Sequence, residues 1–253
     1  ELVSLFKLGK VAGSLIRIPD KMSPKLASIK KILEEGLCSS DLFVKDAAES
    51  IEPIIDQALL LANKYDCVVA NPPYMGRAAM NGELKDYVGS RYPRSKSDLF
   101  AMFIERGVEL VGTNDFCAMV TMQSWMFLSS YEEMRTRLLD NFTINCMVHM
   151  ANMVMGIAFG TAATVFRNVH VPSYVESFSY VNYEDLNDRE VPYIFPVPNE
   201  RLKSISADNF HKIPGSPIAY WASKRFLEIF EKASPLGGIA QPLQGATTSD
   251  NNR

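Results

Sequence analysis

The stretch that determines the fold is Asp66-Cys67-Val68-Val69-Ala70-Asn71-Pro72-Pro73-Tyr74. Its apolar, β-branched first half predicts a short buried strand. The two prolines end that strand, because proline lacks a backbone N–H and restricts the conformation of the residue before it. Ligands of open α/β sheets bind beyond the carboxyl ends of the strands. The stretch therefore predicts a strand with a functional loop at its carboxyl end.

The residues after this loop alternate between helical and strand patterns. Helices are expected at about 98–111 and 130–139, and strands at 116–121 and 144–150. This alternation is typical of a parallel sheet covered by helices. Two later apolar runs, 162–166 and 174–181, are expected to pair as antiparallel strands at one edge. We therefore predict an α/β fold with a mostly parallel sheet and antiparallel edge strands.

The flanks of this core carry weaker signals. Residues 23–64 are expected to form helices, residues 13–19 a short strand, and residues 75–97 a polar loop. From residue 185 onward, prolines and polar residues predict a linker or extended arm, with one more helix at 222–232. We divide the chain into an N-terminal part with a helical insertion (1–65), a catalytic core (66–183) and an arm leading into a target-recognition region (184–253).

Composition limits the class of protein. Of 253 residues, 47% are hydrophobic and 22% charged, as in ordinary globular proteins, and the net charge of -3 excludes a small basic protein that coats nucleic acid. The four cysteines form no Cys-x-x-Cys pair, which predicts reduced thiols in a cytoplasmic protein and no metal site. No apolar run approaches the roughly 20 residues of a membrane span, and we identify no signal peptide. We therefore expect no membrane partner.

The residue types Asn-Pro-Pro-aromatic suit the methylation of an exocyclic amine on a planar ring. The lone pair of such a nitrogen is delocalised into the ring, and two oxygens that accept its N–H groups can localise the lone pair and aim it at an electrophile. Asn71 offers a side-chain oxygen, Pro72 a carbonyl on a restricted backbone, and Tyr74 a flat face, with Pro73 completing the motif. The alternative is a rigid turn with an aromatic ring packed beneath it.

Residues 68–76 resemble the catalytic motif of S-adenosylmethionine-dependent N6-adenine DNA methyltransferases, especially the large enzymes of bacterial or archaeal restriction-modification and phage-exclusion (BREX-type) systems. The similarity continues through Ser97-Asp98-Leu99-Phe100, 116–139 and 155–165. It implies a Rossmann-like class I methyltransferase sheet. It also implies that Asn71 and the Pro72 carbonyl hold N6 of an adenine flipped out of double-stranded DNA, while Tyr74 stacks on the base. Phe159 is the candidate for a second aromatic wall, or else a core residue of a β-hairpin.

One feature of that family is missing. Its glycine-rich loop, which cradles S-adenosylmethionine, follows the first strand, and no Gly-x-Gly pattern opens a helix in this sequence. We expect that loop upstream of Glu1, in a longer protein of which this chain is a piece. The cofactor pocket is then incomplete, and the activity of this piece alone is left open.

Basic residues follow the motif, where DNA phosphates are expected to run: Arg77, Lys85, Arg91, Arg94 and Lys96. A solvated loop is the alternative explanation. Residues 241–253 resemble the entry to a target-recognition domain, and restriction or phage-defence subunits are candidate partners. Two other functions remain open. One is the same chemistry on RNA or on a protein glutamine, and the other is a non-catalytic interaction module that has lost cofactor binding.

Overall fold

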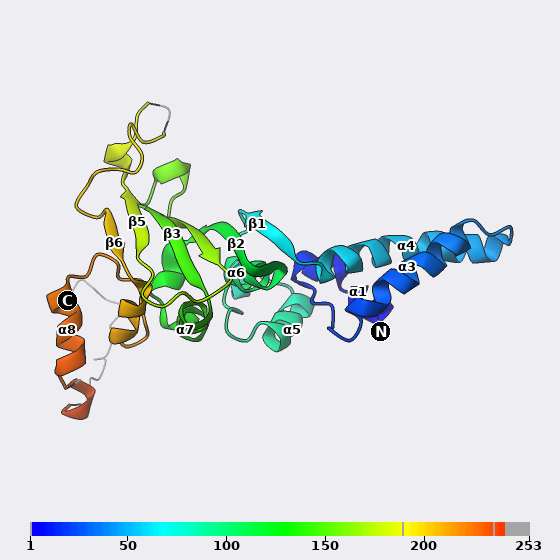
Figure 1. The fold of residues 1–253 in the computed structure, drawn as a ribbon, viewed down its shortest axis with the longest axis horizontal. Helices are drawn as coiled ribbons and strands as arrows, with labels where there is room; N and C mark the ends of the chain where they lie inside the picture. The colour runs from blue at the N-terminus through cyan, green and yellow to red at the C-terminus, as the bar shows by residue number, and fades with distance from the viewer. Residues whose placement is uncertain (1, 189, 235, 241–253) are drawn as a thin grey trace, which may run out of the picture.

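The computed structural model describes residues 2–188, 190–234 and 236–240. It shows an elongated molecule with a sheet at one end and a long helical hairpin projecting from the other (Figure 1). The sheet has six strands in the order β1-β2-β4-β3-β5-β6. The strands are β1 (Tyr65–Ala70), β2 (Val111–Met122), β3 (Thr143–Met150), β4 (Thr161–Arg167), β5 (Glu176–Val181) and β6 (Lys203–Ile205). The expected α/β class is confirmed.

The strand pairing corrects one part of the expectation. β1 pairs parallel with β2, and β3 pairs parallel with β5. β4 lies inside the sheet, antiparallel to both β2 and β3, and β5 is not its partner. The antiparallel pair expected from 162–166 and 174–181 is therefore wrong, whereas β6 is an antiparallel edge strand. Nearness in sequence suggested the pair, but β4 instead fills the gap between two strands formed earlier in the chain.

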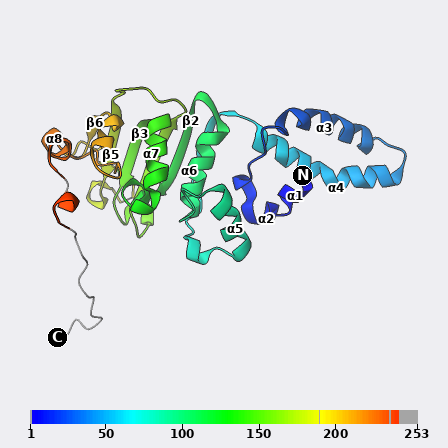
Figure 2. The same ribbon diagram turned by 90° about the horizontal axis from the view of Figure 1, so that it is seen from below.

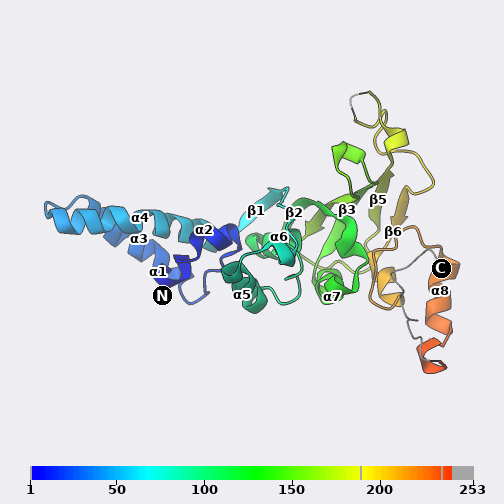
Figure 3. The same ribbon diagram turned by 180° about the vertical axis from the view of Figure 1, so that it is seen from behind.

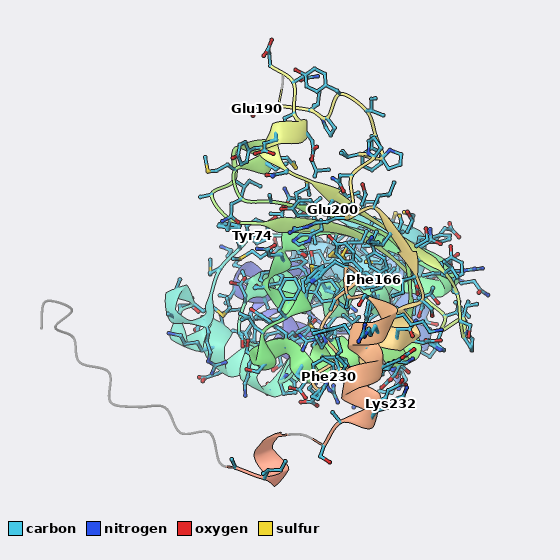
Figure 4. All side chains as sticks on the ribbon, turned by 90° about the vertical axis from the view of Figure 1, so that its left-hand side faces the viewer. Tyr74, Phe166, Glu190, Glu200, Phe230 and Lys232 are labelled. Atoms are coloured by element: carbon cyan, nitrogen blue, oxygen red, sulfur yellow. The ribbon has the colours of Figure 1, made fainter. Side chains whose placement is uncertain are left out.

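Helices cover one face of the sheet (Figure 2). α6 (Leu99–Leu110) connects β1 to β2, and α7 (Glu132–Asn141) connects β2 to β3. Their apolar sides and this face of the sheet form the main core, with Phe100, Trp125 and Phe166 almost fully buried. Figure 4 shows Phe166 beneath the sheet, in the helical layer. Removing such aromatic side chains from water is the main source of stability in this layer.

The opposite face of the sheet is more open. β1 lies at the sheet edge, and Val69 on it is 74% exposed. The expected burial of this strand is wrong on that side, because an apolar run predicts a strand without showing how many faces are covered. Loops after β3 and β5 cover the other end of this face with a small cluster that includes Met150, Val181 and Val197.

A second core lies between the sheet and the projecting hairpin. The hairpin consists of α3 (Ser23–Leu37) and α4 (Leu42–Ala62), as the helical pattern predicted (Figure 3). Shorter helices that contribute to this core are α1 (Leu2–Phe6), α2 (Gly9–Ala12) and α5 (Gly82–Arg91). The strand expected at 13–19 is wrong. Those residues begin with a 3-10 turn, Gly13–Leu15, and buried Arg106 donates hydrogen bonds to the carbonyls of Ser14 and Ile16 at 3.0 Å each.

The segment after residue 200 packs on the sheet. Besides β6 it forms a 3-10 helix (Ala207–Lys212), and its residues Phe210, Ile218 and Tyr220 are buried in the main core. The extended arm expected from residue 184 is therefore wrong for residues 203–220. The helix expected at 222–232 is confirmed as α8 (Lys224–Lys232), while 241–253 lies outside the described residues. No helix among the described residues has the length and apolar character needed to cross a membrane.

Candidate active site

The Asn-Pro-Pro-Tyr motif lies directly after β1, at its carboxyl end. Asn71 and Pro73 are exposed, Pro72 is buried, and Tyr74 is half-buried. The strand ends here because two successive residues lack the N–H that a sheet ladder needs. The loop therefore presents the Asn71 side chain to solvent, while buried Pro72 anchors the loop to the protein.

Asp98 holds the C-terminal end of the loop, directly after Tyr74. Its carboxylate accepts a hydrogen bond from the backbone N–H of Met75 at 2.9 Å and caps α6 by accepting from Phe100 N–H at 3.3 Å. Two backbone bonds close the same junction, from Leu99 N–H to the Met75 carbonyl (3.1 Å) and from Arg77 N–H to the Ser97 carbonyl (2.9 Å). Asp98 is only 8% exposed, and this burial raises the pKa of its carboxyl group. The residue after Tyr74 is therefore fixed to the start of the helix that packs beneath β1.

The hydroxyl of Tyr74 connects the motif to the next strand. It lies 3.2 Å from the Asn71 side-chain oxygen and 3.3 Å from the carbonyl of Val120 on β2, and its one hydrogen can serve either acceptor. Partial burial raises the pKa of Tyr74, so the hydroxyl stays protonated and remains a donor at neutral pH. Figure 4 shows Tyr74 beside the sheet. Tyr74 thereby orients the Asn71 amide.

The structure brings Phe159 to Tyr74. Their ring centroids are 5.5 Å apart with an interplanar angle of 69°, and Phe100 meets the Tyr74 ring edge-on from α6 at 6.2 Å. Phe159 is 36% exposed, at the end of a loop after β3 in which Met153 and Met155 have left-handed φ values of 69° and 59°. The sequence allows two roles for Phe159, contact with the base or a place in the core of a hairpin. The structure puts it at the motif, but edge-to-face rather than parallel to Tyr74.

The basic residues after the motif are distributed unevenly. Arg77 and Lys96 are exposed on two segments joined beside the motif by the bond from Arg77 N–H to Ser97. Arg94 is paired with Glu133 on α7, at 2.7 Å between Nε and Oε1. Arg91 is the last residue of α5, a helix within the segment that was expected to be loop-like. Lys85 is half-buried on α5 as well. Of the five basic residues expected near DNA phosphates, Arg77 and Lys96 are therefore the exposed ones beside the motif, and neither takes part in this ion pair.

The described residues do not fit the methionine end of S-adenosylmethionine. Gly13 and Gly156 have positive φ values, but a Cβ added to either would meet open space, so neither marks a close approach of backbone to a ligand. Gly160 is packed against the Gln123 side chain. Among the described residues, no turn from a strand into a helix carries a Gly-x-Gly pair.

A sequence model of the Eco57I restriction-modification methylase family matches residues 18–154, more than half of the chain. The chain belongs to this family. The methyltransferase family expected from the motif is thus confirmed. The match covers the motif, Asp98 and the strands β1, β2 and β3.

Two curated relatives extend the match over almost the whole chain. The adenine-specific methyltransferase BrxX of Escherichia coli O9:H4 (strain HS) is 42% identical over 241 residues, which cover 93% of this chain and 20% of that protein. The adenine-specific methyltransferase PglX of Lacticaseibacillus casei (strain Zhang) is 33% identical over 265 residues, covering 99% and 22%. The chain spans about a fifth of the length of these relatives.

Solved structures resemble the chain more loosely. One, from a study of the assembly of a type I restriction-modification system, has a TM-score of 0.47 at 14% identity and covers 70% of this chain and 42% of its own. Another, the methyltransferase subunit of a type I system from Streptococcus thermophilus, has a TM-score of 0.37 at 14% identity, with coverages of 68% and 33%.

Proposed function

We propose that this chain is the amine-binding part of an enzyme that transfers a methyl group from S-adenosylmethionine to N6 of adenine in double-stranded DNA, within a restriction-modification or phage-defence system. The observation that carries the proposal is the Asn71–Tyr74 loop at the carboxyl end of β1, held by Asp98. Family membership and the names of both relatives agree with this chemistry.

Each group of the loop has a role in holding the amine. The side-chain oxygen of Asn71 has two lone pairs, so it can accept from the Tyr74 hydroxyl and from one N6–H at the same time. The Pro72 carbonyl accepts the other N6–H from a backbone of restricted φ. The two acceptors draw the nitrogen lone pair out of the ring system and fix its direction. No side chain with a tuned pKa is needed, because the nitrogen loses its proton after the new bond has formed.

The base reaches this loop only when it is flipped out of the duplex, since N6 is inaccessible inside the stack. Tyr74 offers one ring face. Phe159 lies edge-on to Tyr74 and forms a second aromatic wall beside the base. Arg77 and Lys96, exposed beside the motif, contact phosphates near the flipped nucleotide.

The methyl donor is S-adenosylmethionine, and we place its glycine loop outside these residues. Support comes from the length of the relatives and from the outer edge of β1, which has no partner strand among the described residues. Target recognition and any partner subunits belong to the longer protein as well. Assays of function therefore use the full natural protein.

The test is transfer of tritium-labelled methyl groups from S-adenosylmethionine to unmethylated DNA, RNA and protein. Digestion and mass spectrometry then identify the product, and long-read sequencing of the DNA identifies the methylated site. We expect N6-methyladenine in DNA, lost by a factor of about 100 or more in Asn71→Ala because an oriented acceptor is removed. Asn63→Ala, at another exposed asparagine beyond the end of α4, is the matched control and keeps full activity.

Label in RNA or in a protein glutamine, with none in DNA, would replace the DNA proposal by the same chemistry on another amine or amide. No label on any acceptor from a folded full-length protein would indicate a non-catalytic interaction module. Equal activity of Asn71→Ala and wild type would remove the assigned role of the motif.

A further inference from the structure

A line of three hydrogen-bonded side chains, Tyr220, His149 and Gln123, joins the C-terminal segment to the end of the Phe159 loop, where β4 begins. Tyr220 contacts Nδ1 of His149 through its hydroxyl at 3.0 Å, and Nε2 of His149 is hydrogen-bonded to the side-chain oxygen of Gln123. Gln123 directly follows β2, and His149 is the penultimate residue of β3. With the Gln123 amide assigned so that its oxygen faces His149, that oxygen accepts, which assigns the His149 proton to Nε2 and lets Nδ1 accept from Tyr220.

Gln123 contacts Gly160 twice, and Gly160 is the neighbour of Phe159. The backbone N–H of Gln123 donates to the Gly160 carbonyl at 3.0 Å. The amide of Gln123 also fills the space beside Gly160, so that a Cβ at position 160 would collide with all three terminal amide atoms. The absence of a Cβ at Gly160 leaves room for this position of the Gln123 amide, and the φ of Gly160 is not in the left-handed region. The position of the Gln123 side chain therefore constrains the point where the Phe159 loop enters β4.

The other end of the line is rigid. The Tyr220 ring, 1% exposed, stacks on Phe178 with centroids 4.9 Å apart and an interplanar angle of 4°. His149 is 7% exposed and is enclosed by the rings of Phe127, Tyr180 and Trp221. Burial lowers the pKa of His149 to about 4, so the ring is neutral at pH 7. A neutral ring is needed here, because one nitrogen must donate to Gln123 while the other accepts from Tyr220.

We propose that Gln123, clamped through His149 to Tyr220, is a positioning residue that sets Phe159 against Tyr74 and so shapes the pocket for the flipped base. The inference rests on the proposed function for the identity of the base, while the positioning itself is a property of the fold. It makes the C-terminal segment part of the site, because Tyr220 supplies the fixed end of the line. Precise placement of contact groups depends on such supporting side chains.

The first test measures hydrogen–deuterium exchange of the amides in residues 157–161 of the full natural protein. Gln123→Ala keeps the backbone bond to Gly160 but removes the amide, and we expect exchange in this segment to increase about threefold or more. Tyr220→Phe removes only the hydroxyl and should increase exchange in the same segment. The matched control is Tyr174→Phe, whose hydroxyl bonds to the Asn145 side chain at 3.1 Å and which should leave the segment unchanged. Unchanged exchange in Gln123→Ala would overturn the inference, whatever the protein methylates.

The second test is a double-mutant cycle on methylation of the DNA site identified above. Gln123→Ala and Phe159→Ala should each lower kcat about tenfold with KM for S-adenosylmethionine unchanged, because a small misplacement near the reacting atom slows the reaction. The double variant should be no slower than Phe159→Ala, since Gln123 acts through Phe159. Gly160→Ala should match Gln123→Ala. Losses that multiply in the double variant would overturn the inference, and absence of methylation by the wild type would reject the proposed function while the exchange result still decides the positioning.

Discussion

Replacing Asp98 with alanine tests whether the junction between the motif and α6 holds the catalytic loop in place. The change removes the acceptor for Phe100 N–H, an N-cap interaction of about 1 kcal/mol. It also leaves the Met75 N–H, bonded at 2.9 Å, without a partner in a half-buried position, at about 1–3 kcal/mol. The expected loss in the free energy of unfolding is therefore about 2–4 kcal/mol, together with a lower methylation rate.

Asp98→Asn separates hydrogen bonding from charge. Burial raises the pKa of Asp98, which means that the site disfavours the negative charge, and an asparagine oxygen can accept the same N–H groups. We expect Asp98→Asn to recover most of the stability and of the methylation rate. Urea unfolding and methyl transfer by the full natural protein are the two measurements.

The matched control is Asn81→Ala. Asn81 caps the neighbouring helix α5 by accepting from Leu84 N–H at 2.9 Å, a hydrogen bond within α5 rather than to the motif loop. It should lose about 1 kcal/mol and keep its methylation rate. An Asp98→Ala variant that methylates as fast as Asn81→Ala, or an Asp98→Asn variant as impaired as Asp98→Ala, would refute the assigned role of this hydrogen bond.

Three further predictions concern other buried or charged groups. Burial raises the pKa of Glu176 from 4.5 to about 7, so the folded state binds more protons than the unfolded state between these pH values, and the wild type loses stability as the pH rises through this range. Relative to wild type, Glu176→Gln should therefore be more stable by up to about 3 kcal/mol at pH 8 and equally stable at pH 4. Urea unfolding at the two pH values measures this difference. Arg135, 1% exposed, donates to four backbone carbonyls, and Arg135→Met should destabilise the protein by about 3–5 kcal/mol in the same assay, because the carbonyls lose their donors. Arg77→Ala should reduce the steepness of log DNA-binding constant against log salt concentration by about 1. Arg94→Ala should change this slope less, because Glu133 already neutralises the Arg94 guanidinium. Equal slopes for the two variants would contradict the assignment of Arg77 to a phosphate contact.

The strands β1 to β5 and the helices α3, α4, α6, α7 and α8 could be predicted from the sequence because each has its own periodicity, whereas α5 and β6 could not. The order of strands could not. β4 contains Ala162-Ala163-Thr164-Val165-Phe166, an apolar run that shows a strand but carries no information about its neighbours. Its place between β2 and β3 depends on the whole sheet, in which Phe166 packs against Trp125 with centroids 5.9 Å apart. Similarly, residues 203–220 have many polar residues and prolines, and they join the core through the few that are large and apolar, such as Phe210.

The motif could be predicted because proline and asparagine have distinctive effects directly after a strand. The ion pair of Arg94 with Glu133 could not, since it joins a loop to a helix 39 residues later in the chain. A signal for Asp98 existed, because Asp before an apolar helical pattern indicates an N-cap. What the sequence lacks is the second use of that carboxylate, on Met75, which requires the loop to return to the start of α6.

The rule that located Asn71 also applies to Gln123 and His149. β2 and β3 both run antiparallel to β4, and β1 runs parallel to β2, so the carboxyl ends of β1, β2 and β3 meet at one edge of the sheet. Asn71 follows the first of these ends, Gln123 follows the second, and His149 lies at the third. A polar side chain at that edge lies near the site whether or not it belongs to a motif. The parallel arrangement was expected from the sequence, so the two supporting residues were within reach of the same argument that identified the catalytic loop.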